Sequence, residues 1–210
     1  MSGRQEEILD AALAIADEHG IEAVSMRALA DRIGVTPMAL YRHVKDKAAL
    51  LDAMVGRLLA ALLPPGGAED RAWDERLTAF AYACREMTQR HPWAAHLLFS
   101  RPAVTPDAVR AVDAIYLALL EAGVAEPEVP RLERLISTFL LGFAASEASG
   151  RFAGGALDPR GRRGRLPDGA IPGHRRLEPW LDLPVDLTAE FEADLDDIRR
   201  LIRARARRRE

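Results

Sequence analysis

The side chains best suited to binding a polyanion are concentrated between Arg27 and Lys47. This stretch holds five basic residues and two acidic ones, whereas residues 1–26 hold six acids and one arginine. Lysine and arginine bind phosphate oxygens, and arginine also donates paired hydrogen bonds to one planar acceptor. Because the net charge of the chain is −3, the positive charge is local, as salt-sensitive phosphate contacts require. An ordinary solvated helix face could carry the same number of charges. The charge count alone therefore does not show that this stretch binds a polyanion.

The capping and apolar residues of this stretch have the spacing of a helix-turn-helix. Ser25 is suited to cap a helix over 26–33, and Gly34 follows where the chain must turn with positive φ. Thr36 can cap a second helix that has Pro37 at its first position. An ordinary helical hairpin is the alternative. One face of each helix is apolar at a spacing of four residues: Leu29 with Ile33, and Leu40 with Val44.

The segment 26–54, MRALADRIGVTPMALYRHVKDKAALLDAM, resembles the DNA-binding domain of the tetracycline-repressor (TetR) family of regulators. Its most family-like part is LYRHVKDKAALLDAM, with a Leu-Tyr pair in the recognition helix and a lysine that opens the fourth helix. The resemblance is strong over residues 4–55 and continues as helix order and short pieces such as HPWAAHLLFSRP. It implies a DNA-reading head, a connecting fourth helix, and a C-terminal domain that binds a small molecule and dimerises.

Side chains on the outer faces of the helix-turn-helix are the predicted contacts to double-stranded DNA. Arg42 can donate two hydrogen bonds to guanine, and we expect it at base edges together with Met38 and Ala39. Tyr41 and Lys47 match residues that contact phosphate in the resembling family. A two-fold dimer would then bind a pseudo-palindromic operator. The predicted DNA-binding set is Arg27, Thr36, Pro37, Met38, Ala39, Tyr41, Arg42, His43 and Lys47.

Composition favours an all-α fold. Apolar residues make up 49% of the chain, strong helix formers dominate, and no strand-like alternation occurs. We expect a three-helix head over residues 1–47 and a helical ligand-binding and dimerisation domain over 48–210. Residues 154–184 are rich in Gly, Pro and Arg and predict a flexible loop, which Trp180, Leu181 and Leu183 would re-anchor. The other expected helices cover about residues 4–19, 46–62, 70–90, 105–123, 130–152 and 188 onward, with a short one after Pro92.

A mainly apolar small-molecule effector is expected among the helices predicted between residues 70 and 152. Aromatic and sulfur side chains there offer adaptable walls, and a few polar groups could orient a ligand. The break at Pro92 can open a gap between helices. A place in the ordinary core is the alternative for each residue. The predicted pocket residues are Phe80, Tyr82, Cys84, Met87, Trp93, His96, Phe99, Tyr116, Phe139, Phe143 and Glu147.

A homodimer is expected through the helix predicted over 130–152 and the last helix. Two such helices from each chain would form a four-helix bundle. Some of the apolar side chains must instead face the core of their own subunit. The predicted interface residues are Leu132, Leu135, Ile136, Phe139, Phe191, Leu195, Ile198 and Ile202.

Signatures of catalysis, metal binding and membrane insertion are absent from the sequence. GxSxG, HExxH and GxxxxGK[ST] do not occur, and the five histidines lack metal-ligand spacing. We therefore expect no enzyme activity, no cofactor, no metal and no membrane partner. The single cysteine and the polar N-terminus indicate a cytoplasmic protein.

Two other functions remain open at this point. A helical enzyme with a fused helix-turn-helix would need an acid–base pair in its C-terminal pocket. An architectural or division-related DNA-binding protein of the same fold would have no small-molecule inducer and a filled C-terminal core.

Overall fold

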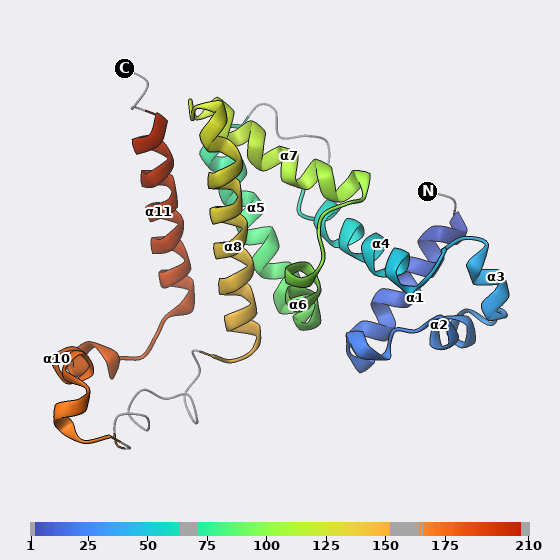
Figure 1. Ribbon diagram of the computed structural model, residues 1–210, viewed down its shortest axis with the longest axis horizontal. Coiled ribbons are helices and arrows are strands. Elements are labelled where there is room, and N and C mark those ends of the chain that lie inside the picture. The colour runs from blue at the N-terminus through green and yellow to red at the C-terminus, as the bar shows by residue number, and fades with distance from the viewer. Residues whose placement is uncertain (1–2, 64–70, 152–163, 165, 207–210) are drawn as a thin grey trace.

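The computed structural model describes residues 3–63, 71–151, 164 and 166–206. All regular structure within these residues is helical (Figure 1), as the all-α prediction required. The elements in chain order are α1 (Gly3–His19), η1 (Ile21–Ala23), α2 (Met26–Ile33), α3 (Pro37–Tyr41), α4 (Lys47–Ala60), α5 (Trp73–Arg90), α6 (Pro92–Ser100), α7 (Pro106–Glu121), η2 (Glu126–Glu128), α8 (Val129–Ala148), η3 (Asp168–Ala170), α10 (Pro172–Leu181) and α11 (Leu187–Ala206).

The first three helices form a small bundle at one end of the molecule (Figure 1). Local caps set its boundaries, because Ser25 Oγ accepts a hydrogen bond from Ala28 N (3.1 Å) and Thr36 Oγ1 accepts one from Ala39 N (3.3 Å). Gly34 ends α2 with a φ of 76°, a left-handed conformation that favours glycine. The helix-turn-helix prediction is therefore confirmed. The buried side chains that join its helices are Ile8, Ala12, Ile15, Leu29, Ala30 and Leu40.

Helix α4 joins the head to the rest of the chain and packs on both. It contacts α1 on the head side and, more extensively, α7 on the other side. The crossing with α7 is close because Gly56 faces Thr105, the residue that caps α7. A Cβ atom at Gly56 would overlap the Thr105 hydroxyl. One helix is thus shared by the two parts of the molecule.

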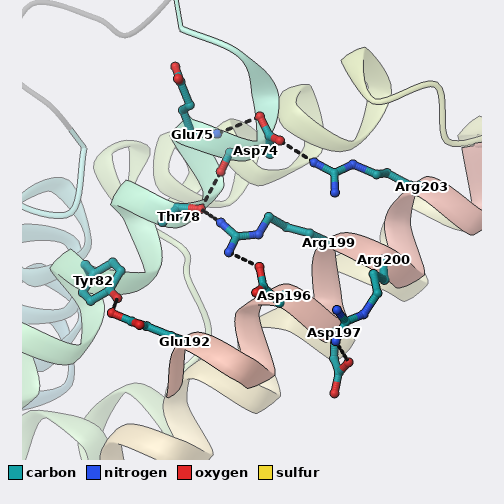
Figure 2. Close-up of polar contacts among 10 residues, drawn as sticks. All are labelled: Asp74, Glu75, Thr78, Tyr82, Glu192, Asp196, Asp197, Arg199, Arg200 and Arg203. Carbon is teal, nitrogen blue, oxygen red and sulfur yellow. Dashed lines mark hydrogen bonds and ion pairs between the residues drawn. The ribbon is translucent and has the colours of Figure 1, made fainter. Parts of the chain in front are cut away.

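Helix α11 lies beside α8 and runs antiparallel to it, next to the bundle that α5, α7 and α8 form (Figure 1). Figure 2 shows its polar edge against α5, where Arg199 Nη1 donates to Thr78 Oγ1 (2.7 Å) and Arg203 Nη2 donates to Asp74 Oδ2 (2.7 Å). Tyr82 also donates to Glu192 (3.0 Å). These contacts fix which face of α11 turns inward.

The predicted dimer interface needs correction, because most of its members lie in the core of their own chain. Six of the eight residues are at most 9% exposed: Leu132, Ile136, Phe191, Leu195, Ile198 and Ile202. Only Leu135, at 44% exposed, and the half-buried Phe139 remain accessible to a partner. The apolar stripe of α11 is the inner face of a subunit helix, so its length and spacing did not indicate an interface.

The segment predicted as a loop over 154–184 contains a helix, α10, in its last third. Its first part lies largely outside the described residues. Pro172 begins this helix at a position where proline is tolerated. The prediction that Trp180, Leu181 and Leu183 re-anchor the segment was wrong, since these side chains are 65%, 36% and 59% exposed.

Two other helix boundaries differ from expectation. Helix α5 begins at Trp73 rather than near residue 70. Helix α8 ends at Ala148, short of the expected residue 152, because Gly150 takes a φ of 67°. No helix in the described part of the chain is long and apolar enough to cross a membrane.

Candidate nucleic-acid interface and ligand cavity

The outward face of α3 carries most of the predicted DNA contacts. Met38 is 72% exposed and Tyr41 is 47% exposed, while Leu40 on the opposite side is 1% exposed and anchors the helix. Arg42 follows directly as the C-cap residue and keeps a helical backbone. A rigid head therefore presents a short protruding helix. Of the predicted set, Ala39 is half-buried and the others are exposed: Arg27, Thr36, Pro37, Met38, Tyr41, Arg42, His43 and Lys47.

Four of the five cations in this stretch are uncompensated. Arg32 donates two hydrogen bonds to Glu18 of α1 (2.7 and 2.5 Å), which raise the pKa of Arg32 and lower the pKa of Glu18. Arg32 is thereby committed to holding α2 on α1. Unpaired cations beside an exposed helix attract phosphate. Within the described residues, no ion pair involves the other four, which are Arg27, Arg42, Lys45 and Lys47.

Lys45 was missing from the predicted DNA contacts. It is exposed and lies in the turn between α3 and α4, close in sequence to Lys47. The signal that could have found it was the basic count of the stretch, which included Lys45 without giving it a role.

Polar contacts tie the head to the C-terminal domain at a second place besides α4. Asp17 of α1 accepts a hydrogen bond from Trp93 Nε1 (2.7 Å) and lies 2.6 Å from His91 Nδ1. The α1–α4 contact has a polar pair of its own, because Arg57 of α4 donates to Asp10 (3.2 Å). Trp93, predicted to line a pocket, is therefore a junction residue between α6 and the head.

A cavity of about 150 Å³ lies between α4, α5, α7 and α8. Its walls are mostly hydrocarbon, and a volume of this size holds about one aromatic ring. The α4 side of the wall consists of Val55, Leu59 and, just after the helix, Leu62. The cavity therefore lies directly against the helix that leads to the head.

The predicted pocket residues are not brought together in this cavity. Phe80 and Cys84 line it, whereas His96 and Phe99 line an open groove with residues of α8. Met87 lines a separate hollow with residues of α1 and α4. Trp93 lies at the junction, and Tyr116 is half-buried on α7 outside all three hollows. Three of the remaining four pack on Phe191 of α11: Tyr82, Phe139 and Phe143. The fourth, Glu147, binds Arg85.

Glu147, predicted to orient a ligand, is instead committed to a buried ion pair. Arg85 donates to both of its oxygens (2.8 and 2.6 Å), and this bonding lowers the pKa of Glu147. The guanidinium also lies over the rings of Phe143 and Phe191, with 5.7 and 5.0 Å to their centroids. This cluster holds α5, α8 and α11 together and has a structural role.

Three polar residues of the cavity wall were missed by the sequence analysis: Arg101, Glu133 and Ser137. Polar residues usually face solvent. For Glu133 and Ser137 of α8, the only sign of an inward face was that Leu140 and Leu141 follow one to two helical turns later. Arg101 turns to α4, donating through Nε to Asp52 Oδ1 (2.9 Å) and through Nη2 to the Ala48 carbonyl (3.1 Å). Burial raises the pKa of the Cys84 thiol to about 12, so this wall residue is neutral.

Comparisons with known proteins match both parts of the chain. Residues 8–54 match the family described as bacterial regulatory proteins, tetR family, and residues 65–161 match the tetracyclin repressor-like C-terminal domain. The chain is 32% identical, over 68% of its length, to the HTH-type transcriptional repressor DrrR1 of Streptomyces coeruleorubidus. It spans about half of that relative, 53% of its length.

Solved structures agree over nearly the whole chain. The fold is similar to apo ActR from Streptomyces coelicolor, with a TM-score of 0.81, 25% identity, and 98% of this chain and 97% of ActR covered. ActR in complex with actinorhodin matches with a TM-score of 0.79. BioQ bound to its double-stranded DNA operator is 30% identical over 70% of this chain and 88% of BioQ, with a TM-score of 0.60.

Proposed function

The chain belongs to the tetR family of bacterial regulatory proteins, and from this premise we propose that it is a transcriptional repressor that a small, mainly apolar molecule releases from DNA. The observation that carries the proposal is the position of the cavity. One of its walls is α4, the helix that begins directly after the DNA-reading turn. A ligand there touches the element that positions the head. Such a repressor acts on the chromosome, in the bacterial cytoplasm.

The head accounts for the DNA-binding part of the proposal. Two heads related by two-fold symmetry would enter adjacent major grooves of a pseudo-palindromic operator. Met38, Ala39 and Arg42 would contact base edges, and Arg42 can donate two bonds to a guanine. The residues that would hold phosphates and fix the register are Arg27, Thr36, Tyr41, His43, Lys45 and Lys47, with Pro37 placing the helix start.

The accessible face of α8 supports a homodimer. Leu135 is 44% exposed and Phe139 lies one turn further along the same face. An exposed leucine on a subunit's central helix fits an isologous contact with a second copy. A monomeric mass at micromolar concentration, by light scattering, would exclude this dimer.

The cavity suggests how a ligand would change DNA affinity. The volume holds about one aromatic ring, and a larger ligand would press on the α4 wall. Arg101 lines the cavity and holds the first turn of α4 through Asp52 and the Ala48 carbonyl. Displacement there would move α4 and the head attached to it. A coupling of about 1–3 kcal/mol is typical between such sites.

The alternative of an architectural DNA-binding protein without an inducer predicts a filled C-terminal core. The cavity against α4 favours the ligand-responsive repressor over it. A helical enzyme would need a convergent acid–base pair in this cavity. The described residues of the cavity wall include one carboxylate and no histidine, and the relatives that match are transcriptional regulators by name.

Selection of operator sequences from random duplexes tests the DNA-binding part. Arg42→Ala should then cost about 1–3 kcal/mol of binding and relax one base position. Lys47→Ala should weaken all sequences alike and reduce the salt slope by about one. Arg110→Ala, which removes an exposed arginine from α7, is the matched control and should change neither. Unchanged affinity in both head variants would reject this docking.

Filling the cavity tests the ligand-responsive part. Val112 lines the cavity from α7, whereas Val109 on the same helix is 51% exposed. Val112→Phe should block release by an effector while leaving operator affinity intact, and Val109→Phe should respond normally. If a broad compound panel never changes operator affinity of the unmodified protein, the architectural alternative replaces the repressor.

A further inference from the structure

Glu133 is a buried acid that faces the cavity. It is 7% exposed and belongs to the cavity wall on α8. Two other polar residues are equally buried, and both are satisfied within the protein: Arg85 by Glu147, and Thr88 by carbonyls of its own helix. Glu133 accepts one hydrogen bond, from Ser137 Oγ at 2.6 Å. Within the described residues, no basic side chain pairs with it.

Within the described residues, no other side chain of the wall forms an ion pair with this acid. Arg101 donates hydrogen bonds through Nε to Asp52 and through Nη2 to the Ala48 carbonyl. The Cys84 thiol is buried and neutral. The Ser137 hydroxyl already donates its proton to Glu133. Apolar side chains, with Phe80 among them, form the rest of the surface. Among the described residues of this mainly apolar wall, Glu133 is therefore the only carboxylate.

A buried carboxylate without a cationic partner costs free energy that a suitable ligand recovers. Charged groups are rarely buried unless they are paired, and hydrogen bonds between charged partners are the strong ones. A protonated amine brings both the positive charge and the donors that Glu133 lacks. An acidic ligand would meet like charge in an apolar surrounding, which is repulsive.

We propose that the effector is an apolar amine whose ammonium group pairs with Glu133 while its hydrocarbon body fills the space beside Phe80, Leu140 and Leu141. This inference rests on the proposed function, because it names the chemical class of the effector for the same cavity. The carboxylate sets the chemical selectivity, and the size of the hydrocarbon body determines how far the α4 wall must move.

A matched ligand series tests the inference in the full chain. Isothermal titration calorimetry would compare 2-phenylethylamine, 2-phenylethanol and phenylacetate, followed by the naphthyl analogues of each. The amine should bind at least about tenfold more tightly than the alcohol, the amount expected for one charged hydrogen bond, and the acid should bind most weakly. Equal or tighter binding of the alcohol or the acid overturns the inference, as does failure of every amine to bind.

Variants locate the selectivity at one side chain. Glu133→Gln should weaken amine binding about tenfold and leave alcohol binding unchanged. Glu126→Gln, which removes an exposed acid near the start of α8, should change neither. Ser137→Ala keeps the carboxylate and should retain amine binding. Unchanged amine affinity in Glu133→Gln overturns the inference, and if that variant does not fold, the ranking in the unmodified protein decides.

Operator release separates failure of this inference from failure of the repressor proposal. If neutral or acidic compounds release the operator and amines do not, the repressor stands and the role of Glu133 is wrong. If amines bind through Glu133 but no compound changes DNA affinity, the amine site stands and the repressor proposal is wrong.

Discussion

The head and the C-terminal domain are held in shape by contacts of different range. In the head, the caps of α2 and α3 and the cap that opens α4 join residues three positions apart in sequence. In the C-terminal domain, the decisive polar contacts join residues 62, 121 and 129 positions apart. Both partners of a short-range contact lie within a few residues, so the local sequence is enough to predict it. A contact of long range exists only after the helices have packed.

This difference in range has a functional counterpart. The head must present an exposed surface, and local caps set the ends of its short helices, which buried side chains then join. The C-terminal domain encloses a cavity, so its walls come from helices that are distant in sequence. Breaking a long-range contact of the C-terminal domain should therefore lower the stability of the protein more than removing a local cap of the head.

Breaking the buried ion pair of the C-terminal domain should have the largest effect. Arg85→Ala leaves Glu147 buried without its partner, and we expect a loss of about 3 kcal/mol in the free energy of unfolding. Urea denaturation at fixed protein concentration measures it. Arg90→Ala is the control, since its pair with Glu86 is exposed and one helical turn long, where about 0.5 kcal/mol or less is expected. Equal losses would remove the distinction between the two kinds of contact.

Crowding the crossing of α4 and α7 should come next. Gly56→Ala places a Cβ against the Thr105 hydroxyl, and overpacking of this kind costs about 1–3 kcal/mol, partly offset by the better helix propensity of alanine. Thr105→Gly removes the clashing atoms at a small capping cost, so the double variant should recover most of the stability. Chemical denaturation of the four proteins in the cycle tests this, and additive effects would show that the two residues do not meet.

Removing a cap in the head should cost less. Ser25→Ala deletes the acceptor for Ala28 N, with an expected loss of about 1 kcal/mol in the free energy of unfolding. Operator affinity should fall with it, because α2 supports the reading helix. Ser149→Ala, which removes an exposed hydroxyl at the C-terminal end of α8, serves as the control. If Ser25→Ala is as stable as this control, the local caps do not determine the helices of the head.

The smallest effect concerns acid stability. The hydrogen bond from Arg85 lowers the pKa of Glu147 below its usual 4.5 in the folded protein. The folded state therefore binds fewer protons than the unfolded state in this range, and the free energy of unfolding rises with pH. This contribution is present above pH 4.5 and is lost as the pH falls from there through the lower folded-state pKa. Glu147→Gln should flatten that part of the curve in pH-dependent denaturation, in addition to the loss of stability at neutral pH that breaking the pair with Arg85 causes.

Much of the head was predictable because its determinants are local. Ser25, Gly34 and Thr36 have one favourable role each at their positions, as cap, left-handed turn and cap. The exposed side of α3 then follows from the helical period, since Leu40 and Val44 must face inward. The family resemblance of residues 26–54 added the expectation of DNA binding, which the residues by themselves left open between a reader and an ordinary hairpin.

The sites of the C-terminal domain were decided by tertiary structure. Aromatic and sulfur residues indicated that an apolar interior exists. In the structure, however, Phe143 packs on Phe191 of α11, Glu147 pairs with Arg85, and Trp93 binds Asp17 of the head. The inner stripe of α11 has the same periodicity whether it meets its own subunit or a partner.

The sequence by itself therefore determined the helices outside residues 154–184, the caps of the helix-turn-helix, the exposed cationic head and the apolar content of the rest. Only the packing of α4, α5, α7 and α8 decided which side chains enclose a cavity, and that one of them is Glu133. The physical reason is that helical period specifies a face, whereas the partner of that face depends on helices separated by tens of residues. Burial of an acid is a property of the assembled helices and has no local signature.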